Sequence, residues 1–316
     1  MTEYRGARQV RFWWHLRRAR WAVPPDPGLV GSLDAMSNPW LRRRVLNYAH
    51  QGGAKEAPSS TMHAFRTAVA NGADALEMDV HATADGELVV CHDATLDRTT
   101  EGTGRIADHP LPQLRKLDNA HWFVAGHEST FTAEPEEYVL RGRARRDPSF
   151  GIATVREVLE EFPNVFLNFD IKETVPVVDG YEAALAALLK EFGRTDDVLV
   201  ASFHDVALER FRAAGPAIHT VLGLAATTAL WQWVNQGAAK PTILPSEKAV
   251  QPPDRFGPLQ VTNERFVEAA HELGLAVHVW TIDEPEPMAE QLAYGVDGVI
   301  TNCPRLLRQV LQATRS

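Results

Sequence analysis

From residue 45 onward, the sequence alternates short β-rich runs with amphipathic helix patterns. The β-rich runs are 45–49, 75–80, 88–91, 165–171, 198–202, 219–222, 248–251, 276–280 and 298–301. The helix patterns between and after them include 61–71, 181–192, 205–214, 263–273, 284–294 and 304–311. Alternation of this kind is typical of parallel strands that are joined by helical crossovers.

Nine runs are one too many for an eight-stranded barrel, and the excess is resolved locally. Only residues 83–87 separate the second run from the third, and Asp85-Gly86 is a hairpin signal. Because a parallel neighbour needs a crossover of about a dozen residues or more, we predict that 88–91 folds back antiparallel. Eight strands remain, which predicts an α/β fold of the (β/α)₈ (TIM) barrel type. A doubly wound open sheet is the alternative, but no Gly-x-Gly-x-x-Gly motif follows 45–49.

Two segments fall outside this alternation. Residues 105–150 interrupt it between a strand and its helix, and we predict a small insertion near the C-terminal mouth of the barrel. Residues 1–40 form a basic, tryptophan-rich extension, and the barrel itself is predicted over 45–316. The first helix of the barrel, at 61–71, is expected to be capped by Ser59 or Ser60 and to end at Gly72.

Composition excludes several classes of protein. The formal net charge of −9 argues against nucleic-acid binding. Two cysteines in 316 residues do not make a disulfide scaffold, and a reducing compartment fits them. No apolar run reaches the roughly 18 residues of a membrane span, and arginines interrupt any signal-peptide pattern. We therefore expect a cytoplasmic protein. The Arg- and Trp-rich residues 1–30 allow a peripheral membrane contact, and a helix packed on the barrel is the other interpretation.

Polar residues gather where the predicted strands end, which is where barrel active sites lie. Glu77 and Asp79 share one face of their strand, and Asp170 and Lys172 repeat that spacing on another strand. Neighbouring carboxylates repel each other unless they are protonated or bind a cation. Glu77, Asp79 and Asp170 together predict an oxygen-rich site for Mg²⁺ or Ca²⁺ rather than Zn²⁺. A role in bridging loops at the barrel rim is the alternative for any one of them.

Two histidines stand beside this predicted cation site. His50 and His92 each follow a strand run, and such a pair suits a general base and a general acid. Gly52 and Gly53 would let the backbone approach a ligand closely. Lys172 beside a cation would bind an anion, most simply a phosphoryl oxygen. The combination favours hydrolysis of a phosphoester.

These residues resemble the motifs of the glycerophosphodiester phosphodiesterase family. The stretch AHQGG at 49–53 resembles the family's opening His-Arg-Gly motif, and GADALEMDV at 72–80 its Gly-Ala-Asp-x-x-Glu-x-Asp-Val block. Further matching stretches are VVCHD at 89–93, NFDIK at 168–172, SF at 202–203, WT at 280–281 and GVDGVIT at 295–301. The resemblance covers roughly residues 45–310 and implies the barrel fold.

The resemblance implies hydrolysis of a glycerophosphodiester to glycerol 3-phosphate and an alcohol. It implies an acid–base pair (His50 and His92), three cation ligands (Glu77, Asp79 and Asp170) and three substrate contacts (Gln51, Lys172 and Trp280). Gln51 stands where the family usually has an arginine, so a bidentate phosphate clamp is replaced by a neutral contact. Asp170 replaces a usual glutamate, and Asn302 a usual aspartate.

Two other functions remain open. Relatives with this barrel cleave the headgroup from lysophospholipids, as a lysophospholipase D does. The N-terminal extension and the apolar segment 225–234, which could form a lip at the mouth or an ordinary packed helix, favour that activity. A barrel that has lost activity and only binds its ligand is the second possibility, and Gln51 is its one support.

Overall fold

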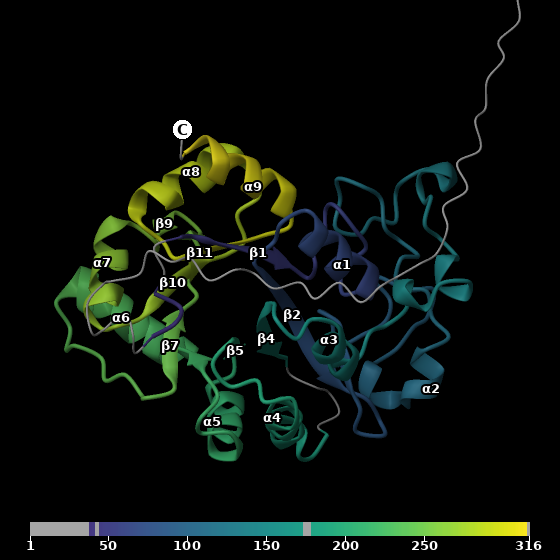
Figure 1. Cartoon of the computed structure of the whole chain (residues 1–316), viewed down its shortest axis with the longest axis horizontal. Coiled ribbons are helices and arrows are strands. Elements are labelled where there is room, and N and C mark those ends of the chain that lie inside the picture. The colour runs from purple at the N-terminus through teal and green to yellow at the C-terminus, as the bar shows by residue number, and fades with distance from the viewer. Residues whose placement is uncertain (1–37, 42–43, 173–177, 315–316) are drawn as a thin grey trace, which may run out of the picture. The chain divides into compact units, whose positions relative to one another are not determined.

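The computed structural model describes residues 38–41, 44–172 and 178–314. Within them, eight parallel strands close a barrel in the order β1, β2, β4, β5, β6, β7, β10 and β11, with β11 paired back to β1 (Figure 1). These strands are β1 (Leu46–His50), β2 (Ala75–Ala82), β4 (Phe166–Ile171), β5 (Val198–Ala201), β6 (Thr220–Val221), β7 (Glu247–Val250), β10 (Ala276–Val279) and β11 (Gly298–Thr301). The predicted (β/α)₈ barrel is confirmed.

The extra β-rich run behaves as predicted. β3 (Leu88–Val90) pairs antiparallel with β2, with Val80 opposite Val90, and it does not enter the barrel wall. A second hairpin was not predicted: β8 (Arg255–Phe256) pairs with β9 (Leu259–Gln260) in the loop that follows β7. Its strands are two residues long, which is too short to show the alternation on which the prediction rested.

Each barrel strand is followed along the chain by a helix, and the helices surround the barrel (Figure 1). They are α1 (Met62–Ala70), α3 (Val155–Glu161), α4 (Tyr181–Glu191), α5 (Asp205–Ala214), α6 (Leu224–Gln236), α7 (Glu264–Glu272), α8 (Pro285–Tyr294) and α9 (Pro304–Ala313). The expected cap of α1 was wrong: Thr61, not Ser59 or Ser60, accepts the hydrogen bond from the Ala64 amide. Thr61 has an extended backbone, as an N-cap requires, whereas Ser60 has a φ of 58°.

The inward-facing side chains explain where a site can form. Two clusters of buried apolar side chains pack between the strands and the helices. A third cluster, which includes Trp40, Leu46 and Tyr48, fills the barrel interior near the amino ends of the strands. Because side chains alternate along a strand, the inward row of β1 continues from Leu46 and Tyr48 to His50. The apolar filling therefore stops one layer below the carboxyl ends, where the inward residues become polar.

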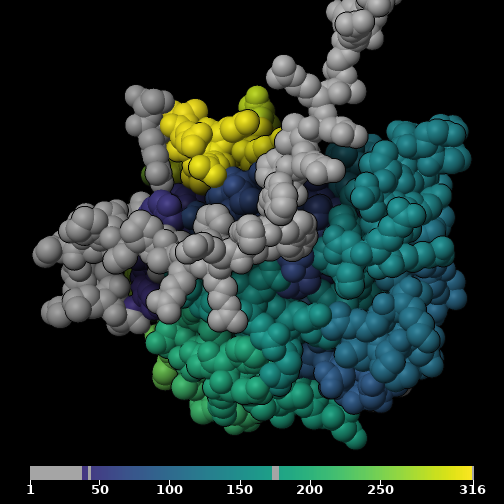
Figure 2. Space-filling view, turned by 45° about the vertical axis from the view of Figure 1, so that its right-hand side comes forward, coloured from purple at the N-terminus to yellow at the C-terminus, as the bar shows by residue number. Residues whose placement is uncertain are grey.

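Residues 105–150 form short helical turns between β3 and α3. These turns are η1 (Ile106–Asp108), α2 (Leu111–Leu114), η2 (Pro135–Glu137), η3 (Arg143–Arg145) and η4 (Pro148–Phe150). Blue and teal residues of this part of the chain gather on one side of the barrel (Figure 2). The Gly126 amide donates to the Lys55 carbonyl, and Glu128 accepts from Asn302, so the segment contacts the loops after β1 and β11.

The expected extension over residues 1–40 lies mostly outside the described residues, and so does its predicted membrane contact. At its described end, Trp40 is fully buried and its indole donates to His219 Nδ1 at 3.1 Å. The Asn38 amide donates to the carbonyls of Lys248 and Gly274 near the amino ends of β7 and β10. Among the described residues, no helix is both long and apolar enough to cross a membrane.

Candidate active site

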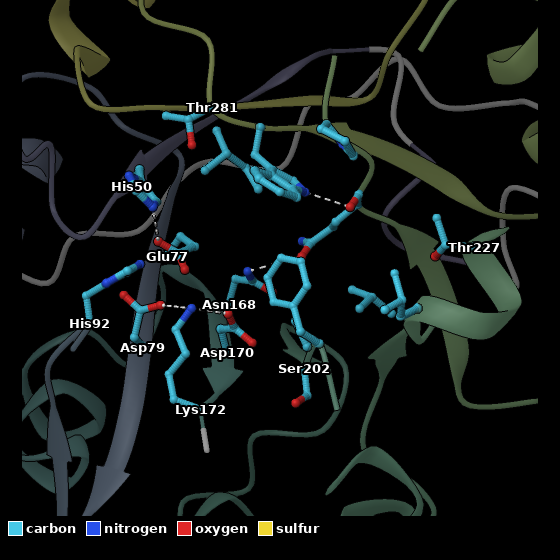
Figure 3. Close-up of a pocket in the computed structure, with 18 of the residues that line it drawn as sticks. His50, Glu77, Asp79, His92, Asn168, Asp170, Lys172, Ser202, Thr227 and Thr281 are labelled. Atoms are coloured by element: carbon cyan, nitrogen blue, oxygen red, sulfur yellow. Dashed lines mark hydrogen bonds and ion pairs between the residues drawn. The ribbon is translucent and has the colours of Figure 1, made fainter. Parts of the chain in front are cut away.

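A cavity of about 310 Å³ opens at the carboxyl ends of the barrel strands (Figure 3). One wall is charged or titratable and is formed by His50, Glu77, Asp79, His92, Asp170 and Lys172. In Figure 3, His50 and His92 lie on the same side as Glu77 and Asp79, and Thr227 lies across the cavity from them. Seven of the eight residues predicted for the site therefore line the cavity: the six of this wall and Trp280.

Strand register explains why residues so far apart in sequence meet here. His50 pairs with Glu77 across β1 and β2, and Glu77 pairs with Asn168 across β2 and β4. Two residues further along, Asp79 pairs with Asp170. Paired residues point to the same side of a sheet, so the polar ends of three adjacent strands form two stacked layers inside the mouth.

The carboxylates of this wall share one lysine. Lys172 Nζ lies 2.9 Å from Asp79 Oδ1 and 2.7 Å from Asp170 Oδ2. Burial and the charge of Asp79 raise the pKa of Glu77 well above its usual value, and Lys172 opposes this effect. Burial also raises the pKa of Asp170 against the influence of Lys172. One ammonium group therefore compensates only part of the negative charge that three buried carboxylates would carry.

The donor chemistry of this wall fits a hard cation. Asp79 Oδ2 and Asp170 Oδ1 are buried without a hydrogen-bond partner. The same holds for Oδ1 of Asn168, whose Nδ2 donates to Gln251 Oε1 at 3.4 Å. Buried oxygens of this kind normally have a partner, and carboxylate and amide oxygens are the ligands that Mg²⁺ and Ca²⁺ prefer. In the part of the chain that the structure describes, no three His, Cys, Asp or Glu side chains converge closely enough to bind a metal ion as they stand. A cation here would require Lys172 to leave the two aspartates.

The two histidines have different neighbours on their Nδ1 side. His50 Nδ1 lies 2.7 Å from Asn302 Oδ1, a neutral amide oxygen. His92 Nδ1 lies 2.7 Å from Asp93 Oδ1, and Arg98 Nε donates to the other oxygen of that carboxylate at 2.7 Å. Although burial opposes it, the hydrogen bonds from His92 and Arg98 hold the pKa of Asp93 well below its usual value. Both rings are thus anchored on one nitrogen and expose the other side to the cavity.

Gln51 does not line the cavity. It is only 2% exposed, has a φ of 51°, and its backbone amide donates to Glu77 Oε2 at 3.1 Å. Its side-chain Nε2 lies 3.3 Å from His50 Nε2. The adjacent glycines serve packing: a Cβ on Gly52 would lie 2.8 Å from Ala64, and one on Gly53 2.9 Å from Pro304. The turn after β1 is therefore pressed against the starts of α1 and α9.

The remainder of the cavity lining is largely apolar. It includes Phe203, Leu222, Leu224, Trp280 and Ile300. The Trp280 ring packs edge-to-face on Phe203 with a centroid distance of 5.6 Å, and its Nε1 donates to the Gln251 carbonyl at 2.7 Å. The segment 225–234 combines both interpretations left open: Trp231 and Trp233 pack against the core, whereas Thr227 lines the cavity, as does Leu224 just before the segment.

Some residues near the site escaped the sequence analysis. Gln251 lines the cavity and could have been found, because it ends a strand run. Lys55, Glu128 and Asp283 surround Asn302 through loop contacts, for which the sequence carries no signal. His81, on the same face of β2 as Asp79, is buried and its Nε2 contacts the His92 carbonyl instead of lining the cavity.

The fold and this cavity define the protein as a (β/α)₈ barrel whose C-terminal mouth is lined by histidines, carboxylates and a lysine. Residues 50–306 match the model of the "Glycerophosphoryl diester phosphodiesterase family". The chain belongs to that family.

Curated relatives carry the name of the same activity, and a solved structure has a similar fold. The glycerophosphodiester phosphodiesterase of Caldanaerobacter subterraneus subsp. tengcongensis is 31% identical over 268 residues, which is 84% of this chain and 96% of that protein. The Bacillus subtilis enzyme of the same name is 30% identical, over 84% of this chain and 86% of its own. A phosphodiesterase from Oleispira antarctica, solved with the product sn-glycerol-3-phosphate, superposes with a TM-score of 0.65 at 24% identity, over 85% of this chain and 96% of that one. The last comparison supports the barrel fold.

Proposed function

We propose that this protein hydrolyses glycerophosphodiesters to glycerol 3-phosphate and an alcohol. The observation that carries the proposal is the shared cavity wall, in which two histidines, three carboxylates and a lysine meet in a member of this family. The named activity of the curated relatives and the product bound to the Oleispira protein are consistent with it.

In this proposal the two histidines move protons. His50 and His92 line the same wall, so one can take a proton from the attacking hydroxyl while the other gives one to the leaving alkoxide. Asn302 holds the first ring and Asp93 the second, so neither ring has to be ordered at the moment of reaction.

The phosphate would be bound by charge. Lys172 is the one lysine or arginine among the described residues that line the cavity, so it is the side chain that would contact the phosphoryl oxygens. Trp280 would face the alcohol part of the substrate. Gln51 was predicted to contact the substrate; from its buried position it would act through His50 instead.

We further propose that the reaction depends on a divalent cation, Mg²⁺ or Ca²⁺, held by Glu77, Asp79 and Asp170. The support is the crowding of three buried carboxylates and the unpartnered oxygens of Asp79 and Asp170. Such a cation would withdraw charge from the phosphoryl oxygens and lower the cost of the developing negative charge.

The test measures the release of glycerol 3-phosphate from glycerophosphocholine and glycerophosphoethanolamine. It compares the wild-type full chain with the variants His50→Ala and His92→Ala. We expect each substitution to lower kcat by about 10²- to 10⁴-fold, since proton transfer is lost. His109→Ala, in the 105–150 insertion and away from the cavity, is the matched control and should retain wild-type turnover. Wild-type turnover in either cavity variant would contradict the two-histidine assignment, and a wild-type chain inactive on every diester would favour a binding barrel.

Cleavage of lysophospholipid headgroups is a second candidate, favoured by the apolar part of the cavity lining. Phe203 and Leu224 line the cavity, yet they are 51% and 54% exposed, so apolar surface continues from the cavity to the solvent. Phe256 and Leu259, in the hairpin after β7, are 76% and 41% exposed. Adding lysophospholipids to the assay decides between the candidates. Co-sedimentation with anionic vesicles, with and without residues 1–30, tests the peripheral membrane contact.

A further inference from the structure

His50 is held by a network of side chains, of which the reaction scheme above uses only the contact with Asn302. Asn302, at the end of β11, is 1% exposed, lines no part of the cavity and lies 2.7 Å from His50. The side chain of Asn302 donates hydrogen bonds to Asp283, in the loop after β10, and to Glu128, in the insertion. We propose that Asn302 is a positioning residue that fixes both the orientation and the tautomer of the His50 ring, and that Asp283 and Glu128 fix Asn302 in turn. The proposal rests on the proposed role of His50.

The amide of Asn302 can face only one way. Its Nδ2 donates to Asp283 Oδ2 and to Glu128 Oε1, both at 3.0 Å. Turning the amide over would place its carbonyl oxygen against two carboxylate oxygens and would break both hydrogen bonds. Oδ1 must therefore point at His50.

An amide oxygen only accepts hydrogen bonds, so His50 Nδ1 must be the donor. Whenever the ring is neutral, its proton then sits on Nδ1, and Nε2 carries the free lone pair. The contact of Nε2 is consistent with this tautomer, because the side-chain amide nitrogen of Gln51, which is a donor, lies 3.3 Å from Nε2. The nitrogen that faces Glu77 at 3.8 Å is thus the one free to take a proton.

Asp283 anchors the network to the backbone. Asp283 Oδ1 accepts a hydrogen bond from the backbone N–H of Asn302 at 2.8 Å and another from the Thr301 hydroxyl at 3.0 Å. Lys55 Nζ lies 2.9 Å from the other oxygen. Burial alone would raise the pKa of Asp283, but the hydrogen bonds from Lys55 and Asn302 hold it below its usual value. Asp283 therefore stays an acceptor.

Glu128 connects the insertion to the site. The Gly126 amide donates to the Lys55 carbonyl, which brings this loop against the turn after β1. Glu128 then supplies the second acceptor for Asn302 Nδ2. This gives the 105–150 segment a role in catalysis although none of its residues lines the cavity.

The tautomer can be read directly by two-bond ¹H–¹⁵N correlation spectra of the full chain labelled with ¹⁵N-histidine. The His50 signals are those that His50→Gln removes. We expect the Nδ1–H form in the wild type and a shift toward the Nε2–H form in Asn302→Leu. In the same variant kcat for glycerophosphocholine should fall by about 10- to 100-fold, as for other lost partners of functional histidines, with KM nearly unchanged.

Two further variants separate this role from a loss of packing. Asn38→Leu removes another buried asparagine, near the amino ends of the strands, and should lower stability without changing the His50 tautomer. Glu128 is exposed, so Glu128→Ala should fold even if Asn302→Leu does not. It should lower kcat by a smaller factor, and Glu128→Gln, which keeps an acceptor oxygen, should restore it.

An Nε2–H tautomer in the wild type, or an unchanged tautomer in Asn302→Leu, would overturn the proposal. If Asn302→Leu does not fold, equal kcat for Glu128→Ala and Glu128→Gln would overturn the part played by the insertion. A shifted tautomer with wild-type turnover would support the positioning contact and would instead disprove the proposed role of His50. Failure of the inference and failure of the proposed function are thus distinguishable.

Discussion

His278 shows how far a single side chain can depart from its ordinary chemistry in this barrel. It lies on β10, is fully buried, and neither ring nitrogen has a hydrogen-bond partner among the described residues. Its ring packs on Tyr48 at 4.9 Å and Trp40 at 6.0 Å, and the absence of a side chain at Gly298 leaves room for it. Burial lowers the pKa of His278 to about 3. The folded protein therefore keeps this ring neutral well below pH 6.

This shift predicts an acid-sensitive stability. Below about pH 6.5 the unfolded chain protonates His278 while the folded chain does not, so the free energy of unfolding falls as the pH falls from 6.5 toward 3. Between pH 8 and pH 5 this group alone should remove about 2 kcal/mol. Urea unfolding of the wild type and His278→Leu at both pH values measures it. The variant should lose about 2 kcal/mol less than the wild type, and equal losses in both chains would contradict the buried neutral ring.

At the residue scale, prediction succeeded where a side chain's position follows from strand order. Glu77, Asp79 and Asp170 meet because inward residues at strand ends converge in any parallel barrel. Strand order says nothing of Gln51, since the turn after β1 gives this residue a positive φ and buries its side chain beside His50. Motif position alone does not specify on which side of a turn a side chain points.

At the element scale, the long strands and helices were predictable and the short ones were not. α3 was not among the helices expected, because its seven residues follow an irregular insertion. A local signal was nevertheless present: Thr154 and Glu157 form a capping box in which each side chain accepts from the other's backbone amide. A threonine three residues before a glutamate, ahead of Val158 and Leu159, marks the start of a buried helix.

This capping box predicts a stability effect that is separate from catalysis. Thr154→Ala removes the oxygen that accepts from the Glu157 amide and should cost about 1 kcal/mol in urea unfolding. Thr154→Ser keeps the hydroxyl and should lie close to the wild type. Because α3 lies outside the barrel wall and lines no part of the cavity, kcat should stay unchanged in both variants. Equal stability of the alanine and serine variants would show that the hydroxyl contributes nothing.

At the scale of the whole barrel, the closure of the barrel can be predicted by counting strands. The ion pairs inside the cavity cannot be predicted in this way. Eight alternating units predict that β1 and β11 become neighbours, which the register of Leu46 with Gly298 confirms. The sequence also predicted that Lys172 would lie beside the carboxylates. It could not indicate that the ammonium group sits between Asp79 and Asp170, since a sequence pattern does not specify which side-chain atoms form ion pairs.

If the three carboxylates bind a divalent cation as proposed, the position of Lys172 makes that binding measurable as a change in stability of the whole molecule. Without a divalent cation, the ammonium group compensates two buried aspartates, and removing one partner of a buried ion pair costs about 3 kcal/mol. Lys172→Met should therefore melt well below the wild type in EDTA. A divalent cation at about 100 times its Kd adds about 2.7 kcal/mol to a chain that binds it only when folded.

Mg²⁺ or Ca²⁺ should accordingly raise the Tm of the wild type, and raise that of Lys172→Met further, because no ammonium group competes for Asp79 and Asp170. Lys116→Met, an exposed lysine of the insertion, is the matched control and should follow the wild type in both conditions. EDTA should also abolish wild-type turnover. If neither cation changes the Tm of either chain, the three carboxylates are not a cation site, and Lys172 is the permanent partner of the two aspartates.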